Sequence, residues 1–159
     1  IMIFRGLIEA SPSENALAMV VAHEIAHIKH RDPIVALSRG LLSQIALSLL
    51  TGSSGNEIAG KLLGDAGLLT AMHFSRQQES AADEAGLSAI MNRYGHTNDA
   101  SRIFERFLEA EESEGFSLPA MFQTHPASQK RIDAMLKQAR KNNWPASGEL
   151  TALPDFINE

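Results

Sequence analysis

The sequence predicts a mainly α-helical fold with one small β element at its start. Helix-capping signals recur along the chain, apolar residues repeat at helical spacing between them, and only the first residues resemble a strand. The 159 residues correspond to one domain, long enough to bury a substantial core. We expect an α+β domain over 1–142 and an irregular tail over 143–159.

The composition excludes several classes of protein. Hydrophobic residues make up 44% of the chain and charged residues 21%, which is typical of a globular protein and not of a disordered one. The net charge is −5, and the only basic run is a short one over 130–141, so we expect no nucleic-acid partner. Cysteine is absent, which leaves His, Asp and Glu as metal ligands.

The first expected elements are a strand and a helix. Residues 1–4, Ile-Met-Ile-Phe, resemble a strand and not the charged start of a signal peptide, so we expect the N-terminal part of the domain to precede them. Ser11 then acts as a helix cap, with Pro12 at the first helical position and Glu14 three residues past the cap. This helix ends before Asp32-Pro33, because the residue before a proline is disfavoured in helical geometry.

A second helix is expected over 34–50, ending in the loop Thr-Gly-Ser-Ser-Gly-Asn. Its apolar run is interrupted by Arg39 and stops short of the roughly 18 to 20 residues that a membrane span needs. We therefore favour a buried helix or a surface lid over membrane insertion. Apolar residues over 41–50 and 62–72 would form such a lid.

The remaining segments are also expected to be helical. The pattern is helical from 57 to about 94, with Gly95 as the C-terminal stop. Asn98 is expected to cap a further helix with an apolar stripe. A loop over 115–126 then leads to a last helix that contains Ile132, Met135 and Leu136.

The segment His23-Glu24-Ile25-Ala26-His27 is the first candidate for chemistry. Residues four apart on a helix share one face, so His23 and His27 can bind one metal ion, with Glu24 beside it. This H-E-x-x-H pattern is the signature of zinc peptidases, in which the glutamate is the general base. The pattern also occurs by chance, so a third ligand has to be found.

Two further histidine positions bear on that third ligand. The metzincin extension requires a histidine six residues after His27, where this chain has Pro33, so that class is excluded. His30 lies one turn beyond His27, but its spacing matches no known extension. We interpret His30 as a solvated histidine at a helix C-terminus, where the helix dipole favours it.

A carboxylate on another helix is the better candidate. Glu79 and Asp83 are four apart, so Glu79 can complete a His₂Glu set with an open position while Asp83 accepts a hydrogen bond from a ligand histidine. Arg76, one turn earlier, is expected to orient Glu79. The alternative is a solvated acidic surface, but the small and apolar residues around Asp83 favour a packed helix.

Three motifs in order resemble one family. The motifs AHEIAHIKHRD, FSRQQESAADEAGL and THPASQKRI are similar to those of the HtpX-like and CAAX-prenyl-protease family of zinc metallopeptidases, peptidase family M48, and most resemble its soluble periplasmic BepA-like or LoiP-like branch. The resemblance implies a zincin-like domain in which His23, His27 and Glu79 bind one zinc ion, Glu24 is the catalytic base and Asp83 supports a ligand. Family members usually carry a further helix and strand before the point where this sequence starts.

The third motif supplies further candidates. His125 is expected to donate to the oxyanion of the transition state and to occupy the open zinc position at rest; the alternative is a loop histidine bonded to backbone. Arg131 is expected either to stabilise charge or to hold the loop in place. Tyr94, the only tyrosine, is interpreted as a packing residue, and His73 and His96 as incidental.

The resulting hypothesis is a zinc metalloendopeptidase that hydrolyses unfolded or misassembled proteins in the bacterial envelope, in the periplasm or associated with the membrane. The compartment and substrate class come from the resemblance. The alternative is a zinc-binding holdase or assembly factor with a silent peptidase site, and a third reading is a regulatory scaffold. Glu24 favours the enzyme, because a structural zinc site does not need an adjacent acid.

Overall fold

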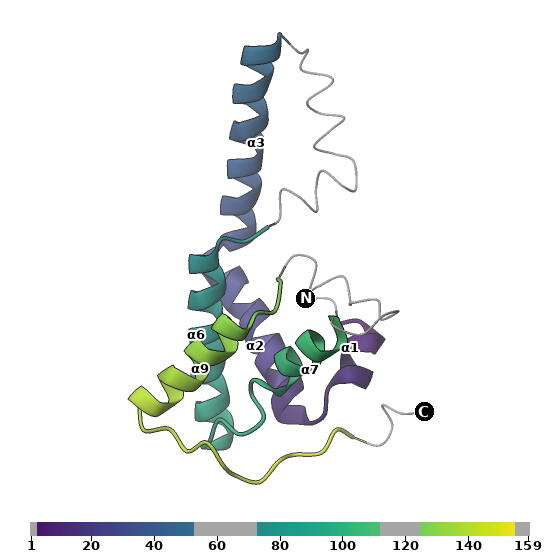
Figure 1. Ribbon diagram of the computed structural model, residues 1–159, viewed down its shortest axis with the longest axis vertical. Helices are drawn as coiled ribbons and strands as arrows, with labels where there is room; N and C mark the ends of the chain where they lie inside the picture. Colours follow the sequence, from purple (N-terminus) through teal and green to yellow (C-terminus); the bar gives the residue numbers. More distant parts are fainter. Residues whose placement is uncertain (1–2, 53–72, 112–124, 155–159) are drawn as a thin grey trace.

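The computed structural model describes residues 3–52, 73–111 and 125–154. Helices dominate the described residues, which confirms the mainly α-helical prediction (Figure 1). The described helices are α1 (Arg5–Ala10), α2 (Glu14–His30), α3 (Asp32–Thr51), α6 (Arg76–Tyr94), α7 (Arg102–Glu111) and α9 (Gln129–Lys141).

The small N-terminal β element is not found among the described residues, which contain no strand. Phe4 has an extended backbone, but Arg5–Ala10 form α1, whose first turn is closed by a hydrogen bond from Leu7 N to Phe4 O (3.0 Å). A strand requires a neighbouring strand to pair its backbone groups, and the described residues offer none. Residues 1 and 2 lie outside the described part.

The main helix α2 begins two residues later than predicted. Ser13 is its cap and accepts a hydrogen bond from Ala16 N (3.1 Å), whereas Ser11 ends α1 by donating from Oγ to Leu7 O (2.7 Å). A cap side chain must accept from a free N–H two or three residues ahead, and Ser13 is the serine that does so here.

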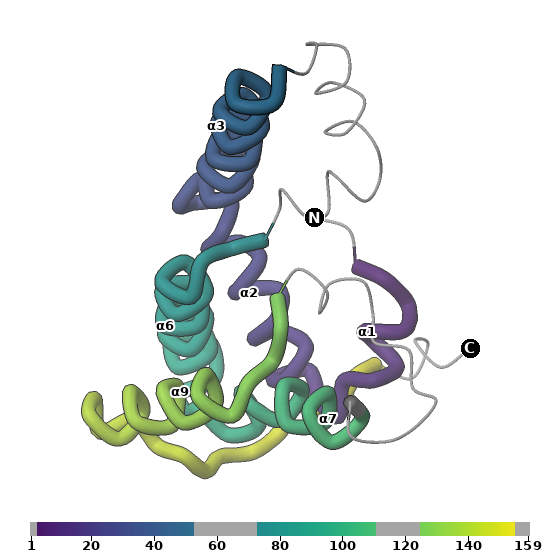
Figure 2. The backbone as a smooth tube through the Cα atoms, turned by 45° about the horizontal axis from the view of Figure 1, so that its top comes forward, coloured from purple at the N-terminus to yellow at the C-terminus, as the bar shows by residue number. Residues whose placement is uncertain are grey.

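The helices α2 and α6 lie side by side at the centre of the fold (Figures 1 and 2). Gly86 permits this close approach, because a Cβ atom there would lie 3.0 Å from Met19 Cε and 3.4 Å from the backbone nitrogen of His23. Helices α7 and α9 close the apolar core with residues that include Ile103, Phe104, Phe107, Ile132 and Met135. The core therefore fixes α6 against the face of α2 that carries the two histidines.

The structure corrects the prediction for α3. The helix has 20 residues instead of 17, and only 11% of its most apolar window is buried, so it is not a buried helix. Its mean hydropathy of 1.6 and its length are sufficient for crossing a membrane, by length and composition only. It projects away from the other helices (Figure 1). Its exposed apolar side chains are Ile34, Val35, Leu37, Leu41, Leu42, Ile45, Leu47, Leu49 and Leu50.

The lid prediction extends beyond the described residues. Residues 62–72, which would form half of the lid, and most of the loop at 51–56 are not described.

The prediction that α6 stops at Gly95 is confirmed, since Gly95 caps the helix with φ 78°. Asn98 does not cap α7, which begins at Arg102, but donates from its side chain to Gly148 O (2.8 Å).

The segment after α9 has no helix or strand over its described part, 142–154, yet it is attached to the start of α2. Glu14 N donates to Thr151 O and Thr151 N donates to Asn15 Oδ1, both at 2.9 Å. Buried His96 lies 3.0 Å from Glu149 O through its Nε2 atom. These contacts hold the segment against the body of the fold.

Candidate metal centre

Helix α2 brings the two predicted histidine ligands together. His23 and His27 lie one turn apart and are each 1% exposed. Their Nε2 atoms are 3.0 Å apart and their ring centroids 4.6 Å apart. The i, i+4 spacing thus places both rings on the buried face of α2, as the sequence predicts.

Helix α6 adds Glu79 to this pair. Glu79 Oε1 lies 3.4 Å from His27 Nε2, and Oε2 lies 3.5 Å from His23 Nε2. The carboxylate is in the first turn of α6, whose start is fixed by a capping box between Ser75 and Gln78. A good cap therefore places the third predicted ligand opposite the histidine pair.

His125 is the fourth member of the cluster. It lies just before α9 and is 4% exposed. Its Nδ1 atom is 2.8 Å from Glu79 Oε1 and 3.4 Å from His23 Nε2. The four ligand atoms of His23, His27, Glu79 and His125 all lie within 4.8 Å of one another. Such a set of three imidazoles and one carboxylate suits a zinc ion.

Each of the two histidines in the cluster that come from α2, His23 and His27, is supported by its own carboxylate. His23 Nδ1 lies 3.0 Å from Asp83 Oδ1, and His27 Nδ1 lies 2.8 Å from Asp32 Oδ2. A carboxylate on Nδ1 directs the lone pair of Nε2 toward a metal. The Asp83 contact follows the sequence prediction. The Asp32 contact does not, because the sequence marks Asp32 only as the point before which the helix ends.

A third residue holds Asp32 in place. Gln78 donates from Nε2 to Asp32 Oδ1 (2.8 Å) and is also part of the capping box of α6. The start of α6 is therefore connected to His27 through two side chains. The sequence signal that could have revealed Asp32 is its position five residues after His27, immediately past the end of the helix.

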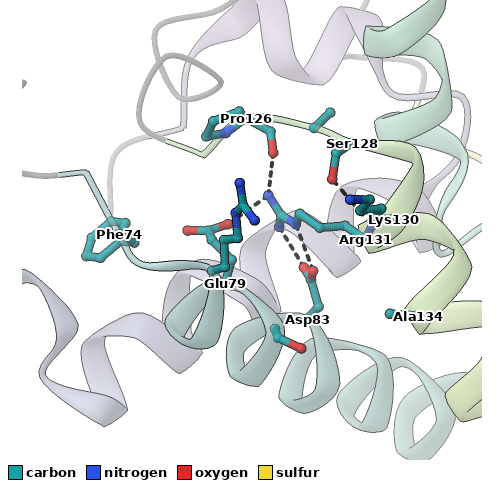
Figure 3. A pocket seen from close by; sticks show the side chains of 11 residues that line it. Phe74, Glu79, Asp83, Pro126, Ser128, Lys130, Arg131 and Ala134 are labelled. Atoms are coloured by element: carbon teal, nitrogen blue, oxygen red, sulfur yellow. Dashed lines mark hydrogen bonds and ion pairs between the residues drawn. The ribbon is translucent and has the colours of Figure 1, made fainter.

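Arg131 connects two of the acidic residues with the loop that carries His125 (Figure 3). Its Nε and Nη2 atoms donate to the two oxygens of Asp83 at 2.8 and 2.7 Å. Its Nη1 atom lies 2.7 Å from Glu79 Oε2 and donates to Pro126 O at 3.0 Å. Both sequence interpretations of Arg131, charge stabilisation and holding the loop, are compatible with this geometry.

Arg76 differs from its predicted place. No hydrogen bond or ion pair joins its side chain to Glu79 within the described residues, and Arg76 is exposed. Arg131 makes that ion pair instead. Residues three apart on a helix can pair, but here the side chain of Arg76 is exposed while that of Glu79 is buried.

Glu24 lies beside the cluster. One of its oxygens, Oε1, is buried and has no hydrogen-bond partner among the described residues; His125 Nε2 lies 3.6 Å from it. A buried carboxylate oxygen without a partner is costly, so its retention requires a reason. A role in accepting a proton at the cluster is such a reason.

The charges within the cluster stabilise one another. Burial alone would raise the pKa of Glu79, but hydrogen bonds from the three histidines and the charge of Arg131 hold that pKa well below its usual range. Asp83 is also buried, and Arg131 and His23 lower its pKa. Burial opposes protonation of His23, yet Asp83 and Glu79 raise its pKa to about 9. The carboxylates are ionised at neutral pH and favour a cation in this place.

Phe74 is a further neighbour that the sequence analysis missed. Its ring stacks on His27 at 4.3 Å and on His125 at 4.8 Å between centroids. It lies just before the cap of α6 and forms an apolar wall of the cluster. A single phenylalanine just before a helix start belongs to no periodic pattern, so the sequence could not single it out.

The other candidates lie outside the cluster. His30 is exposed at the end of α2, with its Nδ1 atom 3.9 Å from Asp32 Oδ2. Tyr94 donates from its hydroxyl to Glu14 Oε1 (2.8 Å). His96 is not incidental, because it is buried and accepts a hydrogen bond from Asn98 N at 3.1 Å.

Comparisons with known proteins agree with this geometry. Peptidase family M48 matches residues 1–139. The chain is 33% identical over 134 residues to mitochondrial metalloendopeptidase OMA1 of Schizosaccharomyces pombe. The aligned region covers 83% of this chain and 39% of that protein. The chain is 31% identical over 147 residues to the protein of the same name in Saccharomyces cerevisiae, covering 90% and 42%.

A bacterial relative is similar to the same extent. The Protease HtpX homolog of Burkholderia multivorans is 31% identical over 164 residues, covering 83% of this chain and 58% of that protein. The chain thus spans about two fifths to three fifths of the length of these relatives. No solved structure matches the chain. The family match extends over the three motifs and the helices that carry the cluster, and we conclude that the chain belongs to peptidase family M48.

Proposed function

We propose that this chain is the catalytic domain of a zinc-dependent endopeptidase, with one zinc ion held by His23, His27 and Glu79. The observation that supports it most is the buried cluster of these side chains with Glu24 Oε1 unpaired beside it. A structural metal site would gain nothing from an unpaired acid at its edge. The family match and the names of the relatives point to the same class of reaction.

In this proposal Glu24 is the general base. A bound zinc ion supplies Lewis acidity and lowers the pKa of a water molecule toward neutrality. Glu24 takes the proton of the attacking water at its unpaired oxygen and passes it to the leaving amine. The site is reached from solvent on the Glu24 side, since the Glu24 side chain is 25% exposed while those of the ligands are almost fully buried.

His125 and Arg131 have separate tasks in the proposal. His125 completes the cluster at rest, moves away when substrate enters, and then donates to the oxyanion, which is worth roughly 3 to 4 kcal/mol. Arg131 keeps Glu79 and Asp83 ionised and holds the backbone at Pro126, next to His125. Asp83 and Asp32 keep the two histidines of α2 in their binding orientation.

The substrate class and the compartment rest on the resemblance. We propose that the substrates are unfolded or misassembled proteins, bound as extended segments. We place the protein in the bacterial envelope, in the periplasm or associated with a membrane. The exposed apolar surface of α3 supports membrane association, and the periplasmic BepA-like or LoiP-like branch stays part of the proposal.

One observation favours a second candidate, a zinc-binding holdase with a silent site. His125 lies within 2.8 Å of Glu79 and 3.4 Å of His23, so the cluster offers four protein ligands. Structural zinc sites have four protein ligands, whereas catalytic sites keep one position open. The two candidates differ in whether His125 leaves the cluster.

Degradation of casein separates the candidates. Wild type and Glu24→Gln are compared at equal zinc content, measured in both samples. Cleavage by the wild type alone establishes the peptidase and the role of Glu24. If neither protein cleaves casein while both retain zinc and slow its aggregation, the holdase is the better description.

A further inference from the structure

A pocket of about 460 Å³ lies on the far side of Glu79, between α6 and α9 (Figure 3). Phe74 and Pro126 contribute to its walls, and Glu79 and Asp83 lie along one side. Arg76 on α6 and Lys130 on α9 also line it. The pocket shares Glu79 with the metal cluster, so the pocket and the cluster are adjacent.

The charge of this pocket is positive. The carboxylates of Glu79 and Asp83 are already occupied, because Arg131 contacts both at 2.7 to 2.8 Å and histidines of the cluster contact both from the other side. Arg76 and Lys130 are exposed, and their side chains have no hydrogen bond or ion pair with the described residues. Arg131 is used in pairing the two acids, so Arg76 and Lys130 are the two cations of the lining that remain free for a ligand.

The apolar part of the lining sets the size of the occupant. Phe74, Pro126, Ala127 and Ala134 provide surface for a short aliphatic stem. A stem of two methylenes that ends in a carboxylate matches this combination of apolar wall and free cations, whereas a lysine or arginine side chain would be repelled.

We propose that this pocket is a substrate subsite that receives an acidic side chain, glutamate or aspartate, next to the cleaved bond. The inference rests on the proposed peptidase function and adds a specificity to it. Arg76 and Lys130 contact the substrate carboxylate, and Arg131 stays bound to Asp83 and Glu79. The proteins that are cleaved fastest therefore carry an acidic residue near the scissile bond.

Quenched fluorescent peptides with blocked termini provide the test. A parent peptide that the zinc-loaded protein cleaves is varied at each position flanking the cleaved bond, with Glu, Gln or Lys. At one position we expect kcat/KM to be about threefold to tenfold higher for the Glu peptide than for the Gln peptide. This is the gain expected from two partly exposed ion pairs, between the substrate carboxylate and Arg76 and Lys130. The ratio should fall as the salt concentration rises.

A charge-reversed variant assigns the preference to the pocket. In Arg76→Glu/Lys130→Glu the ratio of Glu to Gln should fall to one or below, and the Lys peptide should improve. The matched control, Arg93→Glu/Lys137→Glu, has the same charge change on the same two helices outside the pocket lining and should keep the wild-type ratio. Because the readout is a ratio within one protein, a general loss of activity cancels.

The outcomes distinguish this proposal from the function it rests on. Cleavage of the Gln peptide with no position that prefers Glu overturns the subsite and leaves the peptidase intact. The subsite is also overturned if the charge-reversed variant keeps the preference for Glu. The same holds if the preference occurs only in a parallel set of peptides whose C-terminal carboxylate is free. If no peptide is cleaved by zinc-loaded protein, the peptidase proposal falls and the subsite with it.

Discussion

At the scale of single residues, His23 and His27 of α2 are held from different parts of the chain. Asp83 reaches His23 from α6, and Asp32 reaches His27 from the first turn of α3. Neither imidazole can turn without losing its contact of 3.0 or 2.8 Å with a buried carboxylate. The cluster is therefore shaped before a metal arrives, which reduces the entropy lost on binding.

Replacing Asp32 tests this arrangement. We expect Asp32→Ala to lower zinc affinity about 10- to 100-fold, because His27 loses the acceptor that fixes its orientation. Affinity is measured by competition with a chromogenic chelator, and folding by circular dichroism. The control is Asp133→Ala, an exposed aspartate bonded to Gln129. Equal affinities in the two variants would remove Asp32 from the metal site.

Tyr94 allows a titration with one chromophore. Burial and the hydrogen bond to Glu14 raise the pKa of its hydroxyl from 10.0 to about 12. The folded pKa lies above the unfolded one, so this contact stabilises the fold fully below pH 10 and its contribution is lost as the pH rises toward 12. In a pH titration followed by tyrosinate absorbance, the midpoint should lie well above pH 10, and Glu14→Gln should move it to a lower pH. A wild-type midpoint near 10 would contradict the contact.

At the scale of elements, the distance between α2 and α6 decides whether Glu79 meets the histidines. Gly86 lies where the helices touch, with Met19 and the backbone of His23 opposite. The capping box of α6 then fixes the turn from which Glu79 projects. Helix packing and capping thus position a side chain that no single helix could position.

A larger residue at Gly86 should separate the two helices. We expect Gly86→Val to destabilise the fold by about 1 to 3 kcal/mol and to lower zinc affinity, since overpacking shifts α6 together with Glu79. Gly6→Val is the control, because a Cβ there meets nothing within 4 Å. Denaturant unfolding and chelator competition measure the two effects. Unchanged zinc affinity would show that the cluster tolerates the shift.

The exposed face of α3 makes a separate prediction. Leu42, Leu49 and Leu50 are 66%, 81% and 85% exposed. We expect the wild type to float with vesicles of phosphatidylcholine and phosphatidylglycerol, and the triple variant with glutamine at these positions to remain in solution with an unchanged fold. Leu136→Gln, at an exposed leucine of α9, should bind as the wild type does. Equal flotation of the triple variant would argue against α3 as the contact.

The sequence predicted features that depend on local spacing better than features that depend on tertiary contacts. The H-E-x-x-H and E-x-x-x-D spacings place residues correctly because a helix repeats its faces whatever surrounds it. The predicted cap, Ser11, is wrong because Ser13 also fits the local pattern and only the tertiary path decides between the two serines. Phe74 is brought to the cluster by tertiary packing, which no local spacing encodes, and Asp32, although near His27 in sequence, reaches it only through the chain turn at Arg31.

At the scale of the whole molecule, the cluster lies where three separate parts of the chain meet. His23 and Glu24 come from α2, Glu79 from α6 and His125 from the segment before α9. A bound ion would therefore cross-link segments that are about 50 to 100 residues apart in sequence. Removal of the metal should weaken the fold as well as the proposed chemistry.

Metal removal tests this link. At a zinc concentration a thousandfold above the Kd, binding stabilises the native state by about 4 kcal/mol. For a chain of this size that corresponds to a fall in Tm of roughly 10 °C after chelation, which added zinc should restore. Scanning calorimetry measures both steps. A Tm that is the same with and without zinc would contradict metal binding at the cluster.

Asp32 belongs to two structures at once, because it is the first residue of α3 and the acceptor for His27. The orientation of α3 and the binding of the metal ion are therefore coupled, and each must change the other by the same free energy. Any surface that changes the tilt of α3, and with it the distance from Asp32 to His27, changes the affinity for the metal. The metal in turn must favour one tilt of α3 by the same free energy, so the membrane affinity of this protein should differ between its metal-free and metal-bound forms.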